Sequence, residues 1–360
     1  LKSLTGIHAQ TFIQTPETQG RLSEVKFKNT VPLDIEVRRI GLDVLWDLSE
    51  KVMPTKAAAI AEKIYQQALQ LEQVIFAGFT HEPAVELAEK LLTILPGSFT
   101  RIFYSDNGST STEVALKMAI QYWWNEKKVE GEGEKEEGNG RIKILAFNNS
   151  YHGDTFGAMS VSDRSVFTLA FHDLLFEVIF IDTPTEENID SIKAIIHKHS
   201  NEIAAFIYEP LVQGAGGMNM YEPKLLNEIL NTAKLNDIIC IADEVMTGFG
   251  RTGKFFASEY MHKKPDIICM SKGLTGGTMA LGATACNEKI YNAYLTDDKL
   301  KTFFHGHSFT ANPIACSAAL ASMDLLLLSE TVNAIEWITE ENKKAEETKK
   351  KPAEVPAPES

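Results

Sequence analysis

Four chemically active groups follow short apolar runs in this sequence. Lys272 directly follows "IICMS", and Asp243 stands 29 residues before it, after "IICIA". Glu209 follows "AAFIY", while Gly108 and Ser109 follow "IFYSDN" at the start of a helical pattern. Nearly continuous apolar runs of this kind predict strands that are buried on both faces of a parallel sheet. Because ligands bind at the carboxyl edge of such sheets, we expect these groups to surround one ligand.

The types of these residues indicate the ligand. Gly108 and Ser109 would offer backbone N–H groups and a hydroxyl to a phosphate at a helix N-terminus. Asp243 would hold a protonated ring nitrogen through a charge-assisted hydrogen bond. Lys272 would form an imine with an aldehyde. A phosphate, a basic ring nitrogen and an aldehyde together describe pyridoxal 5′-phosphate, and Tyr151, after "ILAFNNS", would stack on its ring.

Taken singly, these residues also have ordinary interpretations. Ser109 would be part of a helix cap, Asp243 a turn residue and Lys272 a solvated side chain. Their combination at one sheet edge favours the cofactor site instead. His305 and His307 are spaced i, i+2 and the other histidines lie far away in the sequence, so we expect no metal site.

The stretch "IADEVMTGFGRTGKFFASEYMHKKPDIICMSKGLTGG" resembles the signature of the class III pyridoxal-phosphate aminotransferases. The resemblance covers about residues 60–330 and extends to "IFYSDNGSTSTEVALKMAIQYW", "SYHGDTFGAMSVSD", "YEPLVQGAGGMNMY" and "FFHGHSFTANPIACSAALASMDLL". These segments are most similar to the members that act in biotin biosynthesis. The resemblance therefore implies transfer of an amino group from S-adenosylmethionine to 8-amino-7-oxononanoate, with pyridoxal 5′-phosphate as cofactor.

By matching motif, the resemblance implies a role for each candidate residue. Lys272 is expected to be the Schiff-base lysine, and Asp243 the partner of the pyridinium nitrogen. In "HGHSF", Ser308 is expected to reach the phosphate bound by a partner subunit, which makes the protein a homodimer with shared active sites. Gly108 and Ser109 are expected to bind the phosphate and Tyr151 to stack on the ring. The residues expected to line the substrate pocket are Glu209, Asp154, Arg251 and Gly306.

Both ends depart from the family pattern. Family members carry a Trp-Trp-x-Asn stretch and a His-Gly-His turn where this chain reads "GLDVLWDLSEKVMPTKAAA", and they continue past "ASMDLL" to an arginine that binds the substrate carboxylate. We therefore expect the protein to bind the cofactor but to have weak or absent aminotransferase activity. The alternatives are another class III ω-amino-acid aminotransferase or aminomutase, or a catalytically silent protein that binds pyridoxal phosphate.

The elements that must position these residues alternate between strand and helix. The resemblance implies an α/β, aspartate-aminotransferase-like (fold type I) domain with a mostly parallel sheet flanked by helices and a reduced small domain. We expect an N-terminal segment at 1–55, a large cofactor-binding domain at 56–330, and a charged helix with a disordered tail at 331–360. Residues 126–140, rich in Glu, Lys and Gly, predict a surface insertion. Strands are predicted at 100–106, 142–147, 177–182, 203–210, 238–245 and 266–272, and helices at 56–75, 81–95 and 107–124, where Thr110 and Glu113 have capping-box spacing.

The composition excludes several classes of protein. The 360 residues carry a net charge of −14 with a sequence pI near 5.2, which argues against a general nucleic-acid surface. The four cysteines are scattered without a CxxC pair, which indicates a reducing compartment. We see no apolar stretch of membrane-spanning length and no signal-peptide pattern. We therefore expect a cytoplasmic protein that handles small molecules.

Overall fold

The computed structural model describes residues 54–126, 140–166 and 168–350. The chain divides into two compact units, 1–57 and 58–360, and all of the described strands belong to the second. Nearly all of the predicted N-terminal segment, most of the predicted insertion at 126–140 and the last ten residues lie outside the described residues. The three-part domain assignment therefore stays a prediction.

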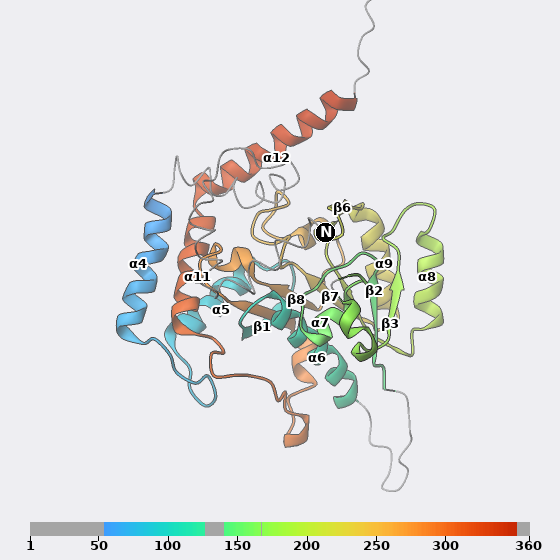
Figure 1. The fold of residues 1–360 in the computed structure, drawn as a ribbon, viewed down its shortest axis with the longest axis horizontal. Helices are drawn as coiled ribbons and strands as arrows, with labels where there is room; N and C mark the ends of the chain where they lie inside the picture. Colours follow the sequence, from blue (N-terminus) through green and yellow to red (C-terminus); the bar gives the residue numbers. More distant parts are fainter. Residues whose placement is uncertain (1–53, 127–139, 167, 351–360) are drawn as a thin grey trace, which may run out of the picture. The chain divides into compact units, whose positions relative to one another are not determined.

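The second unit is built on a mixed sheet of seven strands among the described residues, in the order β1-β9-β8-β7-β4-β2-β3 (Figure 1). The pairs β2–β3, β2–β4, β4–β7 and β7–β8 are parallel, while β9 is antiparallel to both β8 and β1. The predicted mostly parallel sheet is confirmed. The strands are β1 Phe99–Ser105, β2 Lys143–Phe147, β3 Val178–Ile181, β4 Ile203–Tyr208, β7 Ile239–Asp243, β8 Ile267–Met270 and β9 Gly282–Asn287, with a separate hairpin of β5 Val212–Gln213 and β6 Asn219–Met220.

Both faces of the central strands are covered by helices. Along β7, Ile239 and Ile241 pack in the cluster that contains α6 residues such as Val114. Cys240 and Ala242, which alternate with them, pack in the cluster that contains the α5, α9 and α11 side chains. Alternate side chains of a strand point to opposite faces, so β7 is buried on both sides. This double burial explains the continuous apolar runs in the sequence.

The helices surround the sheet, with α4 and α11 on one flank and α8 beside α9 on the other (Figure 1). Among the described residues, no single helix is long and apolar enough to cross a membrane. Of the described helices, only the pair Pro313–Leu326 and Ser329–Lys344, which is bent by 65° at its break, has the length and apolar composition of a membrane span when the two helices are taken together. The α-helices are α4 Pro54–Gln70, α5 Glu82–Ile94, α6 Gly108–Asn125, α7 Phe156–Val161, α8 Ile189–Lys198, α9 Pro223–Leu235, α10 Glu288–Asn292, α11 Pro313–Leu326 and α12 Ser329–Lys350, and the 3₁₀ turns are η1 Leu169–Leu174, η2 Ala257–Tyr260, η3 Lys272–Thr275 and η4 Lys299–Lys301.

The prediction that Thr110 and Glu113 form the capping box of α6 was wrong, because the capping box lies three residues earlier. Asn107, not Thr110, is the N-cap, and its side chain accepts from the Thr110 N–H at 3.0 Å while the Thr110 hydroxyl accepts from the Asn107 N–H at 3.0 Å. Glu113 instead accepts from the Thr155 hydroxyl at 2.6 Å and from the Ala158 N–H at 3.2 Å. Because the chain already turns at Asn107, the helix begins earlier and Glu113 is left to hold the first turn of α7.

Candidate active site

Six of the described strands end at one edge of the sheet, and five of them lead into predicted site residues. Since β9 is antiparallel to both β8 and β1, strand β1 runs in the same direction as β8, β7, β4 and β2. Their carboxyl ends lead into Gly108, Tyr151, Glu209, Asp243 and Lys272 in turn, after β1, β2, β4, β7 and β8. The sheet therefore brings the loops that carry the predicted residues to its ligand-binding edge.

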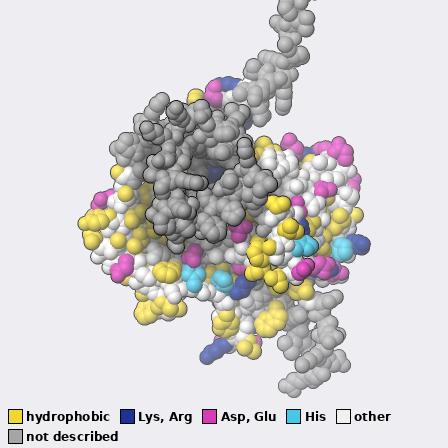
Figure 2. Space-filling view, in the orientation of Figure 1, with side chains coloured by type: hydrophobic (Ala, Val, Ile, Leu, Met, Phe, Trp, Pro, Cys, Tyr) yellow, Lys and Arg dark blue, Asp and Glu magenta, His cyan; other side chains and the backbone are white. Residues whose placement is uncertain are grey.

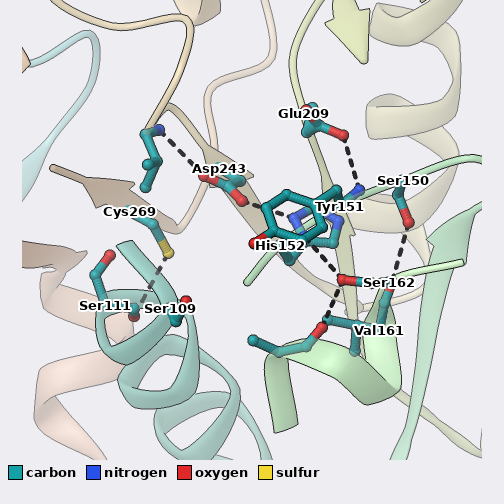
Figure 3. A network of polar contacts seen from close by, with 12 residues as sticks. Ser109, Ser111, Ser150, Tyr151, His152, Val161, Ser162, Glu209, Asp243 and Cys269 are labelled. Atoms are coloured by element: carbon teal, nitrogen blue, oxygen red, sulfur yellow. Dashed lines mark hydrogen bonds and ion pairs between the residues drawn. The ribbon is translucent and has the colours of Figure 1, made fainter. Parts of the chain in front are cut away.

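Asp243 is paired with His152 inside the protein (Figure 3). The His152 Nδ1 lies 2.7 Å from Asp243 Oδ2, and both side chains are buried. Asp243 Oδ1 accepts from the Val245 N–H at 3.1 Å, so both oxygens of the carboxylate are held. The His152 Nε2 atom has no hydrogen-bond partner in the described part of the chain. An imidazole that carries its proton on Nδ1 would donate to Asp243 and keep the carboxylate in one orientation.

Tyr151 is held at both its backbone and its phenol. Its N–H donates to Glu209 Oε1 at 3.1 Å, and its hydroxyl donates to Asp154 Oδ2 at 3.0 Å. Burial, together with the nearby Asp154 carboxylate, raises the pKa of Tyr151 to about 12. The Asp154 N–H in turn donates to the Ser109 hydroxyl at 3.0 Å. Tyr151 thus stays a neutral aromatic ring, tied to the first turn of α6.

The first turn of α6 packs tightly against the strand end that carries Asp243. A Cβ atom on Gly108 would lie 2.7 Å from a methyl group of Val245, so only glycine fits this approach. A Cβ on Gly153 would lie 2.3 Å from the Ser109 hydroxyl. In the first turn of a helix the N–H groups have no intrahelical acceptor, so those of Gly108 and Ser109 are available to an anion.

Lys272 stands at a strained position. Its φ is 45°, a left-handed conformation that is uncommon outside glycine, and its side chain is exposed. The next residue, Gly273, has no room for a Cβ because Phe249 Cβ would lie 2.9 Å away. Strained non-glycine residues of this kind concentrate at functional sites. Close packing therefore explains Gly273, and the left-handed turn explains Gly276 and Gly277, whose φ angles are 61° and 77°.

The neighbour of Asp243 has a structural task. The buried Glu244 carboxylate accepts from the N–H groups of Ala257 at 3.0 Å and Ser258 at 2.6 Å, and from the Thr247 hydroxyl at 2.5 Å. Burial raises the pKa of Glu244. Because its oxygens are used to hold the turn before η2, Glu244 takes no part in the candidate site.

Among the described residues, three predicted site residues form no hydrogen bond or ion pair with Asp243 or Tyr151. Arg251 and Gly306 are exposed, and the Ser308 carbonyl accepts a hydrogen bond from Gln73. The segment around Ser308 is anchored by His307, whose Nε2 lies 3.3 Å from Asp106 Oδ1. These assignments stay predictions.

The model of the class III aminotransferase family matches residues 28–357. The chain belongs to the class III aminotransferases. It is 49% identical over 283 residues to the adenosylmethionine-8-amino-7-oxononanoate aminotransferase of Synechococcus elongatus, covering 76% of this chain and 64% of that protein. It is 40% identical over 304 residues to the enzyme of the same name from Geobacter sulfurreducens, covering 79% of this chain and 65% of that protein. The chain thus spans a little under two thirds of the length of these relatives.

Solved structures give the same family. A crystal structure of adenosylmethionine-8-amino-7-oxononanoate aminotransferase from Methanocaldococcus jannaschii superimposes with a TM-score of 0.72 at 36% identity, covering 81% of this chain and 66% of that one. An amine transaminase from an uncultivated Pseudomonas species, in its PLP-bound form, superimposes with a TM-score of 0.69 at 32% identity, covering 77% and 64%. The fold of this class III aminotransferase chain is therefore that of pyridoxal-phosphate transaminases, as the sequence predicted.

His152 is the residue of this class III site whose contact sequence reasoning missed. The sequence predicts no role for it, yet in the structure it pairs with Asp243 across 91 residues of sequence. Its position next to Tyr151, in the loop that follows the buried strand β2, was the available signal. Among the described residues, no group of three or more His, Cys, Asp or Glu side chains could hold a metal ion.

Proposed function

We propose that the protein is a pyridoxal 5′-phosphate-dependent aminotransferase that converts 8-amino-7-oxononanoate to 7,8-diaminononanoate with S-adenosylmethionine as amino donor. The observation that carries the proposal is the arrangement at one sheet edge of an anion-binding helix start, a buried carboxylate, an aromatic ring and a lysine. Two relatives at 40% identity or more bear the name of this enzyme. A cytoplasmic homodimer is part of the same proposal.

The residues of the site fit this cofactor. The first-turn N–H groups of Gly108 and Ser109 and the Ser109 hydroxyl suit its phosphate, and the missing Cβ at Gly108 lets the helix start approach Val245, two residues after Asp243. Asp243, held by His152 and Val245, suits its ring nitrogen because a buried carboxylate stabilises a protonated partner. Tyr151 would cover one ring face. When bound, the cofactor supplies an electron sink for the substrate's α-carbon.

The chain's own residues would position the reactants and move the proton. In the first half-reaction Lys272 Nζ would take a proton from the α-carbon of the amino donor, and in the second it would deliver a proton to the acceptor carbon that receives the amino group. The Asp243 carboxylate would place a negative charge beside the ring nitrogen and so keep that nitrogen protonated, since His152 and the Val245 N–H fix its direction. Tyr151 would exclude water from the ring face.

The proposed partner is a second copy of the chain. Exposed apolar side chains lie on α4 and on the segment that follows it, namely Tyr65, Leu69, Ile75 and Phe79. Figure 2 shows hydrophobic side chains along the edge formed by α4. Clustered exposed apolar residues of this kind mark interaction surfaces. Ser308 would be supplied across this dimer to the neighbouring cofactor phosphate.

The test is an absorbance spectrum of the purified protein with pyridoxal phosphate, before and after borohydride reduction, with peptide mapping of the product. The proposal predicts a visible band and a pyridoxyl group on Lys272, while a label on another lysine would exclude Lys272 as the cofactor-binding residue. Turnover is then measured with both substrates. A bound cofactor without turnover would favour the silent cofactor-binding alternative, and turnover with other ω-amino acids only would favour a different class III activity.

A further inference from the structure

Glu209 faces two loops and has both carboxylate oxygens engaged by backbone. Oε1 accepts from the Tyr151 N–H at 3.1 Å, and Oε2 accepts from the Gly214 N–H at 3.0 Å. The Glu209 side chain is buried, and its own carbonyl accepts from the Tyr221 hydroxyl. Each oxygen of the carboxylate is therefore oriented by one backbone N–H group, and the two N–H groups belong to different loops.

The two loops that Glu209 joins are strained and in direct contact. Asn149, two residues before Tyr151, has a φ of 60°, and Leu211, at the start of the other loop, has a φ of 70°. A Cβ on Gly216 would lie 2.5 Å from the Asn149 carbonyl oxygen. The Gln213 side chain donates to the Asn148 carbonyl at 2.7 Å. Left-handed conformations at non-glycine residues cost energy and persist only where neighbouring contacts hold them.

We propose that Glu209 is a positioning residue that fixes the Tyr151 ring over the cofactor by clamping the 148–154 loop to the 211–217 loop. This inference rests on the proposed function and replaces the sequence-based expectation that Glu209 lines the substrate pocket. The ring is then held at three points: the Tyr151 N–H on Glu209, the phenol on Asp154, and the Asp154 N–H on Ser109. Glu209 is the only one of these partners that also holds the 211–217 loop in the part of the chain that the structure describes.

The clamp can be tested with a double-mutant cycle, because a residue that acts through Tyr151 loses its effect when the ring is absent. The variants are E209Q, Y151A and the double variant, and the measurement is the dissociation constant of pyridoxal phosphate from the apoprotein at pH 8. In E209Q one buried N–H would face an amide NH₂ group instead of an acceptor. We expect E209Q to weaken cofactor binding about tenfold in the wild-type background and less than about twofold in the Y151A background. Equal effects in both backgrounds, or a raised KM for the amino donor with unchanged cofactor affinity, would overturn the clamp.

A second measurement needs no cofactor. In the apoprotein, amide hydrogen exchange over 149–154 and over 211–217 should be faster in E209Q than in the wild type, while the exposed Glu222→Gln control should leave both segments unchanged. If E209Q does not fold, Glu209→Asp, which keeps the charge but is one methylene shorter, should show the same loosening of both segments. Unchanged exchange in a folded variant would overturn the inference. A wild-type protein that fails to bind pyridoxal phosphate would overturn the proposed function instead, and the exchange comparison would still decide the role of Glu209.

Discussion

At the residue scale, three buried acidic side chains in and beside the site have different partners. Asp243 contacts an imidazole, Glu209 holds two loops, and Glu244 holds the turn before η2. A buried carboxyl group without a cation beside it favours its neutral form, whereas hydrogen bonds from N–H groups favour the charged form. For Glu209 and Glu244 burial outweighs these hydrogen bonds and raises the pKa.

Glu209 should make stability fall as the pH rises toward neutrality. Burial is the main cause that raises the pKa of Glu209 to about 7, above its ordinary value of 4.5. Between these two values the native state holds a proton that the unfolded chain has lost, so the free energy of unfolding decreases with rising pH. The loss is on the order of 3 kcal/mol and is complete above about pH 7. Urea unfolding of wild type and E209Q between pH 5 and 8 measures it, and a difference between them that is constant over this range would contradict the assignment.

His152 should contribute a donor that the Asp243 carboxylate requires. Replacing it with leucine removes a hydrogen bond to a buried charged group, which costs about 1.5–3 kcal/mol of unfolding free energy. His152→Asn places an amide N–H near the Nδ1 position and should recover part of that loss. Chemical denaturation of the apoprotein measures both variants. Equal stabilities for the leucine and asparagine variants would mean that packing, and not the hydrogen bond, explains the position of His152.

At the element scale, helix starts position the site. The α6 helix begins at the end of β1 with a capping box at Asn107, and its first turn reaches both Val245 and Asp154. The α7 helix begins nearby and is held by Glu113 of α6. The starts of both helices depend on such contacts, because the first N–H groups of a helix have no acceptor within it.

The cap of α6 should affect cofactor binding as well as stability. Asn107→Ala removes the bond from the Thr110 N–H and should cost about 0.5–2 kcal/mol of unfolding free energy. Asn287→Ala is the matched control, since Asn287 caps α10 through the Ile290 N–H at 3.1 Å and lies at the far end of β9. We expect both variants to lose stability but only Asn107→Ala to weaken pyridoxal phosphate binding in an absorbance titration. Equal cofactor affinity in the two variants would show that the start of α6 does not bind the phosphate.

At the scale of the whole molecule, the proposed dimer would complete the site. The described residues of one chain bring Gly108, Tyr151, Asp243 and the loop of Lys272 to one sheet edge, whereas Ser308 lies on an exposed segment anchored at Asp106 and Gln73. The apolar residues on and after α4 are exposed in the single chain. A second copy of the chain would cover these apolar residues and would place its cofactor phosphate within reach of Ser308.

Cofactor affinity should therefore depend on protein concentration. We expect pyridoxal phosphate to dissociate more readily when the protein is diluted to monomer, because each phosphate would lose the hydroxyl that the other subunit supplies. Ser308→Ala should weaken cofactor binding without changing the dimer. Sedimentation and cofactor titration across the same dilution series measure the two effects. A stable monomer with full cofactor affinity would contradict the shared site.

The sequence by itself determined where most strands lie and which residues stand at their ends. Continuous apolar runs report burial on both faces, so β2, β3, β4, β7 and β8 were predictable, as was the alignment of their carboxyl ends. Strand β9 was missed because its sequence, "GATACN", consists mostly of small and polar residues without a strong apolar pattern. Its antiparallel pairing with β1 and β8 is decided by packing on α6 and not by local preference.

Only the tertiary structure decided which polar atoms meet. The hydrogen-bonded partners are far apart in the sequence: His152 and Asp243 are separated by 91 residues, Tyr151 and Glu209 by 58, and Thr155 and Glu113 by 42. Local patterns encode burial and turn geometry, but a buried donor takes whichever acceptor the packed loops place within about 3 Å of it. For this reason the sequence located the site residues at one edge, while the distinction between a carboxylate that holds a loop and one that faces a ligand came from the fold.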